Sequence, residues 1–210
     1  MSQSRAPRAI VITEGSSPVA LASAARLAAG GVLVLIGTGR TDICEPFTAR
    51  LRADGAAAFA AHLDLTDPPS INRFVESADY LIGAVDVLIS TAGLVDGSWV
   101  GAQHLAAQVI PPMINDGRGD VLLMSPELVG AWSPRAERML DAWVAGLDAE
   151  FVGTGVRASV VRSTGNGQVS PSDIACLIAT MLGAPRTHLR VVEVIPAMTA
   201  FWSISSWSGA

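Results

Sequence analysis

Short runs of apolar, often β-branched residues alternate along this chain with alanine-rich amphipathic stretches, and this alternation restricts the possible folds more than any other feature. The strand-like runs are Ala9–Thr13, Val32–Ile36, Ala58–Asp64, Val85–Ser90, Asp120–Ser125, Val156–Arg162 and Arg190–Ile195. The helical stretches between them lie near Val19–Ala29, Pro46–Ala53, Ser70–Ser77, Gln103–Asn115, Arg135–Phe151 and Ser172–Leu182. Strands buried on both faces and joined by crossover helices predict an α/β fold, a doubly wound parallel sheet of about seven strands with helices on both faces.

Length and composition exclude several classes of protein. A chain of 210 residues with 50% hydrophobic and 16% charged residues predicts one domain over 1–210, ending in an apolar tail from about residue 197. The formal net charge of −5 argues against a nucleic-acid binder, which needs a basic face for phosphates. Because no window approaches the roughly 18 apolar residues of a membrane span, we expect no contact with a membrane.

The cysteine and lysine usage points to a cytoplasmic bacterial protein. Cys44 and Cys176 lie far apart without metal-type spacing, so we expect two buried free thiols in a reducing cytoplasm. All 14 basic residues are arginine, and the chain contains a single tyrosine, Tyr80. Arginine without lysine, together with abundant alanine, is typical of a GC-rich bacterial genome.

Six segments, in their order along the chain, resemble the short-chain dehydrogenase/reductase family. They are AIVITEGSSPVA at 9–20, DLTD at 64–67, VDVLISTAG at 85–93, GRGDVLLMS at 117–125, GTGVR at 153–157 and PSDIA at 171–175. The resemblance implies a single Rossmann-like domain, in a shortened and divergent member of that family. It also implies a dinucleotide site at the carboxyl ends of the strands, where the direction of winding reverses.

The glycine-rich turn of the family, T-G-x-x-x-G-x-G, is altered in this sequence. Its glycines let the backbone approach a pyrophosphate, and here the three positions fall on Glu14, Pro18 and Ala20. Pro18 removes one N–H from the anion-binding end of the helix, and Glu14 would repel a diphosphate by about 1 kcal/mol at 4 Å in water. We expect an ordinary strand-to-helix turn with Pro18 as the first helical residue.

The resemblance nevertheless assigns a set of vestigial cofactor positions. Arg40 follows the second strand and would meet a 2′-phosphate, because no acidic residue ends that strand. The full set of candidate positions is Gly15, Ser16, Ser17, Arg40, Asp64, Leu65, Thr91, Ala92 and Gly93. We therefore expect no cofactor, or NADP if the chain binds one, and we expect no metal site.

The catalytic Asn, Ser, Tyr and Lys of the family are all missing. The resemblance places these four positions, in turn, on Ser98, on Pro126 or Glu127, on Pro134 and on Arg138. Proline has no proton to give, and no lysine exists anywhere in the chain to replace Arg138. The segment that covers the substrate in the family is also shortened after residue 165. The usual hydride chemistry is therefore not expected.

Three functions follow from these observations, and we rank them. The first is a non-catalytic binding or assembly subunit, because the acid–base set and the glycines are absent. The alternative is a divergent NAD(P)-dependent oxidoreductase with an unusual proton donor. The second alternative is a non-redox enzyme of the cyclase, isomerase or dehydratase type that uses Ser125, Glu127 or His104.

Apolar side chains on the long fifth helix suggest contact with a partner chain. Met139, Trp143 and Leu147 form a stripe at i, i+4 and i+8, and the tail Phe201–Trp207 adds two further tryptophans. In the family that this chain resembles, the fourth and fifth helices pair between subunits. We expect a homodimer or homotetramer, or a hetero-oligomer with an active relative, through these two helices and the tail.

Overall fold

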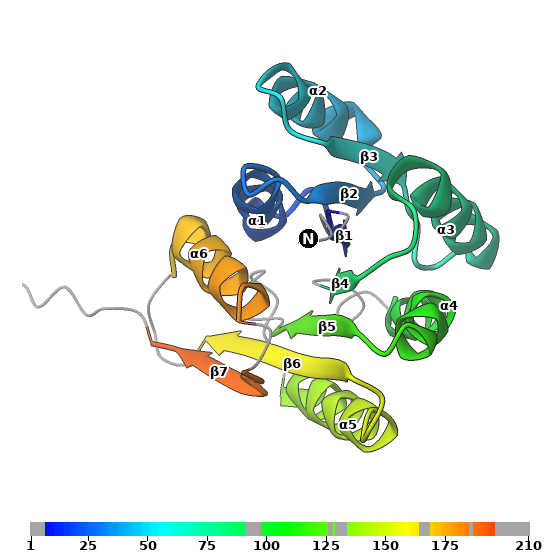
Figure 1. The fold of residues 1–210 in the computed structure, drawn as a ribbon, viewed down its shortest axis with the longest axis vertical. Coiled ribbons are helices and arrows are strands. Elements are labelled where there is room, and N and C mark those ends of the chain that lie inside the picture. Colours follow the sequence, from blue (N-terminus) through cyan, green and yellow to red (C-terminus); the bar gives the residue numbers. More distant parts are fainter. Residues whose placement is uncertain are drawn as a thin grey trace, which may run out of the picture.

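The computed structural model describes residues 7–90, 98–125, 128, 134–163, 169–184 and 187–195. In this part of the chain seven strands form one parallel sheet in the order β3-β2-β1-β4-β5-β6-β7 (Figure 1). The strands are β1 (Ala9–Ile12), β2 (Leu33–Thr38), β3 (Ala58–His62), β4 (Val87–Ser90), β5 (Gly119–Met124), β6 (Val156–Ser163) and β7 (Val191–Val194). The predicted α/β fold with a doubly wound parallel sheet is confirmed.

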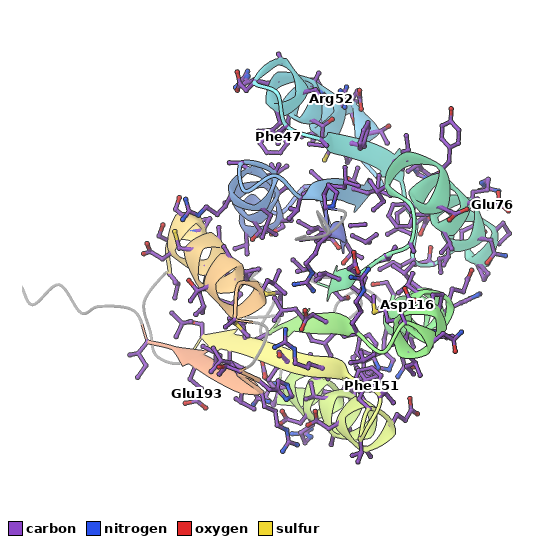
Figure 2. All side chains as sticks on the ribbon, in the orientation of Figure 1. Phe47, Arg52, Glu76, Asp116, Phe151 and Glu193 are labelled. Carbon is purple, nitrogen blue, oxygen red and sulfur yellow. The ribbon has the colours of Figure 1, made fainter. Side chains whose placement is uncertain are left out.

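Helices cover both faces of the sheet, so the hydrophobic core forms two layers. The helices are α1 (Pro18–Ala28), α2 (Thr41–Ala53), α3 (Pro68–Ile82), α4 (Trp99–Asn115), α5 (Pro134–Glu150) and α6 (Pro171–Leu182). One core layer lies between the sheet and α1, α2 and α6, and the other lies between the sheet and α3, α4 and α5 (Figure 1). Figure 2 shows the side chains that fill these layers. Strands buried on both faces explain why their sequences read as continuous apolar runs.

Three helices are longer than the sequence pattern predicts by four residues or more, and one of them, α4, begins at Trp99 rather than at the predicted Gln103. Helix α2 begins at Thr41, whereas the pattern places its start at Pro46, which lies inside the helix. Helix α3 continues to Ile82, beyond the predicted end at Ser77. Its buried positions recur at three- or four-residue intervals up to its last residue. Packing of these side chains against the sheet therefore stabilises the helix beyond the polar residues at its predicted end.

The strand order reverses its direction of winding beside β1, and this position determines where a ligand can bind. Strand β1 pairs with β2 on one side and with β4 on the other, so the two connections that follow β1 and β4 leave the sheet on opposite faces. The carboxyl ends of neighbouring strands then diverge and leave a crevice between them. The turn after β1 and the ends of β2 to β6 are therefore the places to examine for function.

An ion-pair network around Asp120 on β5 holds the amino-terminal ends of the strands, opposite the carboxyl ends that border the crevice. Asp120, whose side chain is 11% exposed, accepts from Arg8 and, at 2.7 Å, from Nε of Arg157 on β6. Arg157 also donates to the backbone oxygens of Ala184 and Thr187. This network ties the starts of β1, β5 and β6 to the segment that follows α6.

The two cysteines differ in exposure. Cys44 on α2 is buried, as expected, but Cys176 on α6 is exposed, so the prediction of two buried thiols is wrong for Cys176. Cys176 occupies the solvent side of its helix, opposite the buried Ile174, Ala175 and Ile178. Among the described residues, no helix combines the length and the apolarity needed to cross a membrane.

Candidate functional site

The turn after β1 retains a glycine-like backbone at a residue that is not glycine. Glu14 has φ 57°, the only positive φ outside glycine in the described residues. Left-handed backbone costs an ordinary residue about 1 kcal/mol or more. The turn is closed by the N–H of Ser17, which donates to the oxygen of Glu14 at 2.9 Å. The chain has therefore replaced the glycine of the family while keeping the backbone conformation that the glycine supplies.

Helix α1 begins directly after this turn and presents its N-terminus to the crevice. Pro18 occupies the first turn of the helix, as predicted, and Ser17 is its N-cap residue without a side-chain cap bond. The hydroxyl oxygen of Ser17 is buried and, within the described ranges, has no hydrogen-bond partner. A buried hydroxyl normally finds a partner, so this orphan at a helix N-terminus fits a bound oxyanion.

A cleft of about 340 Å³ opens beside the turn, over the carboxyl ends of β1, β2 and β3. Its lining brings together three residues assigned from the sequence, namely Asp64, Leu65 and Ser98, with Glu14 and the Gly37–Gly39 segment. A side chain at residue 37 would place its Cβ 2.5 Å from Leu63, so glycine keeps β2 close to the cleft wall. The cleft has the position and shape of an adenosine site in a doubly wound sheet.

The carboxylate of Asp64 is held in its charged form at the edge of this cleft. Its Oδ1 accepts from the hydroxyl of Thr66 at 2.7 Å and from the Thr66 backbone N–H at 2.8 Å. These hydrogen bonds, the hydroxyl foremost, lower the pKa of Asp64 below its ordinary value. Asp64 therefore caps the turn after β3 and offers its second oxygen as an acceptor for a ligand.

Arg40 follows β2, directly after Gly39, which lines the same cleft. Its Nε and Nη2 atoms donate to the two carboxylate oxygens of Asp42, each at 3.0 Å. This side-chain hydrogen bond raises the pKa of Arg40 and lowers that of Asp42. The guanidinium is 62% exposed, so it is fully charged and open to a second anion such as a 2′-phosphate.

A second polar group lies at the end of β5, across the sheet from the cleft. Ser125 is fully buried directly after β5, and its hydroxyl donates to Oε1 of Glu137 at 2.5 Å. Glu137 belongs to the first turn of α5 and is half-buried. A carboxylate in the first turn of a helix is stabilised by the helix dipole. Sequence reasoning assigned Ser125 but missed Glu137.

A charged pair lies one turn further along α5. Asp141 accepts from Nη2 of Arg162, which comes from β6. The Nε atom of Arg162 is buried and has no partner within the described part of the chain. Two acidic residues four positions apart on α5 thus line the same side of the helix, and one of them is neutralised by an arginine.

The positions that the resemblance assigns to catalysis do not form one cluster. Ser98 lines the adenosine-side cleft at the start of α4. Pro134 and Arg138 are exposed on α5. Pro126 and Glu127 lie outside the described residues, as do the cofactor candidates Thr91, Ala92 and Gly93.

The remaining candidates do not converge on a non-redox site. His104 is half-buried within α4, and in the described structure no hydrogen bond joins it to Ser125, whose recorded partner is Glu137. Tyr80 is 89% exposed on α3, so the single tyrosine of the chain lies apart from Ser125. Within the described ranges, no group of three or more His, Cys, Asp or Glu side chains is arranged to hold a metal ion.

Comparison with known proteins settles the family. The model of the short chain dehydrogenase family matches residues 8–128, which is more than half of the chain. The chain belongs to the short-chain dehydrogenase family. The matched segment contains the turn after β1, the adenosine-side cleft and strand β5, so the family assignment rests on the cofactor half of the fold together with Ser125.

Characterised relatives extend over most of this short-chain dehydrogenase. The 1-deoxy-11-beta-hydroxypentalenate dehydrogenase of Streptomyces exfoliatus is 30% identical over 227 residues, covering 87% of this chain and 82% of its own length. The 2,5-dichloro-2,5-cyclohexadiene-1,4-diol dehydrogenase of Sphingobium indicum is 26% identical over 185 residues, covering 77% of this chain and 74% of its own. Both relatives are dehydrogenases.

Solved structures agree on the fold. A metagenomic short-chain oxidoreductase in complex with NADP superposes with a TM-score of 0.79 at 21% identity, covering 91% of this chain and 98% of that structure. An actinorhodin polyketide ketoreductase with NADPH superposes with a TM-score of 0.75 at 17% identity, covering 90% of this chain and 96% of its own. At these identities the likeness shows the fold alone.

These comparisons overturn the first-ranked function. The prediction of a non-catalytic binding or assembly subunit is wrong, because relatives that cover most of the chain are dehydrogenases. The expectation of no cofactor is likewise unsupported. That prediction rested on the missing acid–base set and the missing glycines.

Proposed function

We propose that this protein is an NADP(H)-dependent oxidoreductase that interconverts a secondary alcohol and the corresponding ketone. The observation that carries the proposal is the adenosine-side cleft, with Asp64 at its edge and Arg40 beside it. A charged arginine after β2, with no acidic residue at the end of that strand, favours a cofactor with a 2′-phosphate. The dehydrogenase relatives support the same reaction class.

Residues of this chain fit each part of the cofactor. Arg40 would meet the 2′-phosphate, Asp64 and Leu65 would border the adenine, and Ser17 would supply its unpartnered hydroxyl to the diphosphate. Gly15 and Ser16 complete the turn, and Gly15 is obligatory because a Cβ there would lie 2.3 Å from Ile36. The bound cofactor would supply or accept the hydride. The protein binds and orients the reactants and handles the proton.

The relatives indicate the class of substrate. One relative is named for a hydroxy group on pentalenate and the other for a chlorinated cyclohexadiene diol. Both names describe hydroxyl groups on carbocyclic molecules. We therefore propose an apolar alicyclic alcohol, rather than a sugar or a nucleotide, as the substrate class.

Isothermal titration with NADPH and NADH, followed by a screen of alicyclic alcohols and ketones, tests the proposal. We expect NADPH to bind more tightly than NADH and to raise the melting temperature. We also expect oxidation of at least one cyclic secondary alcohol, followed at 340 nm. Equal or absent binding of both nucleotides would contradict the cofactor assignment. NADPH binding without turnover of any alcohol or ketone would contradict the reaction.

A further inference from the structure

The proposed reaction needs a group that takes the proton of the alcohol, and the tyrosine of the family is absent from this chain. We propose that the carboxylate of Glu137 is this proton acceptor, held in place by Ser125. The inference rests on the proposed oxidoreductase function and names the residue that completes it. Glu137 takes part directly, and Ser125 is a positioning residue, because Ser125 is fully buried and cannot reach a substrate.

Ser125 is a rigid anchor at the end of β5. Its backbone N–H donates to the oxygen of Val161 on β6 at 2.9 Å, which fixes its position in the sheet. The Ser125 hydroxyl donates its proton to Oε1 of Glu137 at 2.5 Å. A carboxylate that accepts from a fixed hydroxyl loses rotational freedom, and a catalytic group needs this restriction to stay in reactive geometry.

The second oxygen of Glu137 remains for the substrate. Within the described residues, Oε2 makes no hydrogen bond and no ion pair, and the side chain is half-buried rather than sealed in the core. A group with one oxygen anchored and the other available can accept a hydroxyl proton directly. By contrast, the exposed Arg138, at the family's lysine position, is a permanent cation and has no lone pair to accept one.

Arg162 and Arg190 form ion pairs with acids of α5 other than Glu137. Asp141, one turn along α5, is paired with Arg162 from β6, so Arg162 does not neutralise Glu137. Asp148, further along α5, is paired with Arg190. Of the three acids at 137, 141 and 148, Glu137 alone is hydrogen-bonded to a neutral donor and forms no ion pair among the described residues.

The step balances as follows. During oxidation the hydroxyl proton of the substrate would pass to Oε2 of Glu137, and a bound oxidised nicotinamide would accept the hydride from the carbinol carbon as the C–O single bond becomes a carbonyl. The ketone, the reduced cofactor and a protonated Glu137 result. The proton then leaves to water, and reduction follows the same path backwards. One proton and one hydride are transferred in each direction.

Four variants test the inference. Glu137→Gln preserves size and the acceptor oxygen for Ser125 but removes the proton-accepting charge. Ser125→Ala removes the anchor, and Glu137→Asp retains a carboxylate one carbon shorter. Glu76→Gln on α3 is the matched control, because Glu76 is an exposed acid on a different helix (Figure 2). NADP⁺ binding by titration, melting temperature, and kcat and KM for alcohol oxidation are measured for each.

We expect Glu137→Gln to lose about 100-fold or more in kcat. NADP⁺ affinity and melting temperature should stay at wild-type values. Glu137→Asp should recover part of the loss, and Ser125→Ala should lose less kcat than Glu137→Gln. Added formate should restore turnover in a fifth variant, Glu137→Ala. Glu76→Gln should match wild type throughout.

The outcomes separate this inference from the proposed function. Wild-type turnover in Glu137→Gln would overturn the role of Glu137 and leave the oxidoreductase function intact. Loss of NADP⁺ binding or of folding in both Glu137→Gln and Glu137→Asp would also overturn it, by showing that Glu137 supports the structure instead. Wild-type protein that binds NADP⁺ but oxidises no alcohol would overturn the proposed function, and this inference with it.

Discussion

The thiol of Cys44 donates to the backbone oxygen of Gly15, 3.1 Å away, and so connects helix α2 to the turn between β1 and α1. Gly15 has no room for a side chain, since its Cβ would lie 2.9 Å from the Cys44 sulfur. The N–H of Gly15 donates to the oxygen of Gly37 on the end of β2. The turn that would carry the diphosphate is thus supported from α2 and from β2, whose Gly37 and Thr38 also line the adenosine-side cleft.

We expect Cys44 to resist alkylation in the folded protein while Cys176 reacts. Burial, as the main cause, raises the pKa of Cys44, so the thiolate that attacks alkylating reagents is scarce, whereas Cys176 is exposed. A raised pKa in the folded state favours the neutral thiol, so this contribution to stability is present at neutral pH and is lost as pH rises past the ordinary cysteine pKa. Peptide mapping after iodoacetamide treatment should show label on Cys176 alone until denaturant is added. Equal labelling of both would contradict the burial of Cys44.

Replacing Glu14 by glycine should stabilise the protein and tighten cofactor binding. Glycine adopts φ 57° without the cost that Glu14 bears, so we expect about 1 kcal/mol more unfolding free energy in urea. Removing the negative charge should lower the NADPH Kd about fivefold, corresponding to roughly 1 kcal/mol of repulsion. Glu14→Gln separates the effects, because it removes the charge and keeps the strained backbone. A Glu14→Gly protein less stable than wild type would contradict the strain argument.

Arg40→Ala should abolish the preference for the phosphorylated cofactor. A charge-assisted hydrogen bond to phosphate contributes about 1.5–3 kcal/mol, so we expect the NADPH Kd to rise about 10-fold or more while the NADH Kd is unchanged. Asp42→Asn should have the reverse effect, because it frees Arg40 from its bidentate partner. Arg50→Ala, on the exposed last turn of α2, is the control. A parallel loss of both cofactors in Arg40→Ala would refute the 2′-phosphate assignment.

Asp120→Asn should destabilise the fold without touching the site. It leaves Arg157, 19% exposed, and Arg8 without their shared carboxylate. Removing one partner of a largely buried network costs about 3 kcal/mol. Urea denaturation measures this loss, with the exposed Asp79→Asn as the comparison. NADPH affinity of the folded variant should equal that of wild type, and a change there would show coupling between the two ends of the sheet.

Helices α4 and α5 enclose an apolar groove of about 660 Å³, and we propose that a second copy of the chain covers it. Trp99 and Trp143 meet edge-to-face in its wall, with ring centroids 4.9 Å apart.

Trp143→Arg would bury an unpaired charge in such an interface, so we expect a smaller species by light scattering after size exclusion. Tyr80→Arg on α3 is the control. A wild-type monomer would refute the proposal. The tail Phe201–Trp207, also expected at the interface, lies outside the described residues.

The strand pattern predicts this fold because the five central strands are buried on both faces and contrast sharply with their flanking helices. Predicted strand ends differ from the structure by at most two residues, as at β4, which begins at Val87 rather than Val85. The larger error is at α2, where Pro46 resembles a helix start. The structure begins the helix five residues earlier, at Thr41. In the sequence, a proline in the second turn of a helix looks the same as a proline in the first turn. Only packing of the helix against the sheet distinguishes the two positions.

The site is predicted less completely, since it depends on contacts between distant segments. Asp64, Leu65 and Ser98 line one cleft, and all three positions were assigned from the family resemblance. Glu137 was missed because its partner Ser125 lies twelve residues earlier, and Glu137 itself lies outside the six segments that carry the family resemblance. The signal available in the sequence was an acidic residue in the first turn of the fifth helix, which is the next predicted element after a strand-like run that ends in serine.

The direction of winding of the sheet reverses beside β1, and this reversal divides the proposed site into two parts that can change independently. Under the proposed function, cofactor recognition would draw mainly on residues before β4, and proton handling would draw on residues after it, with β1 and β4 paired between the two parts. A change of the acid–base group on α5 would therefore leave the nucleotide cleft in place. In this arrangement one half of the sheet would carry the acid–base group, and the other half would hold the cofactor that carries the reducing equivalents.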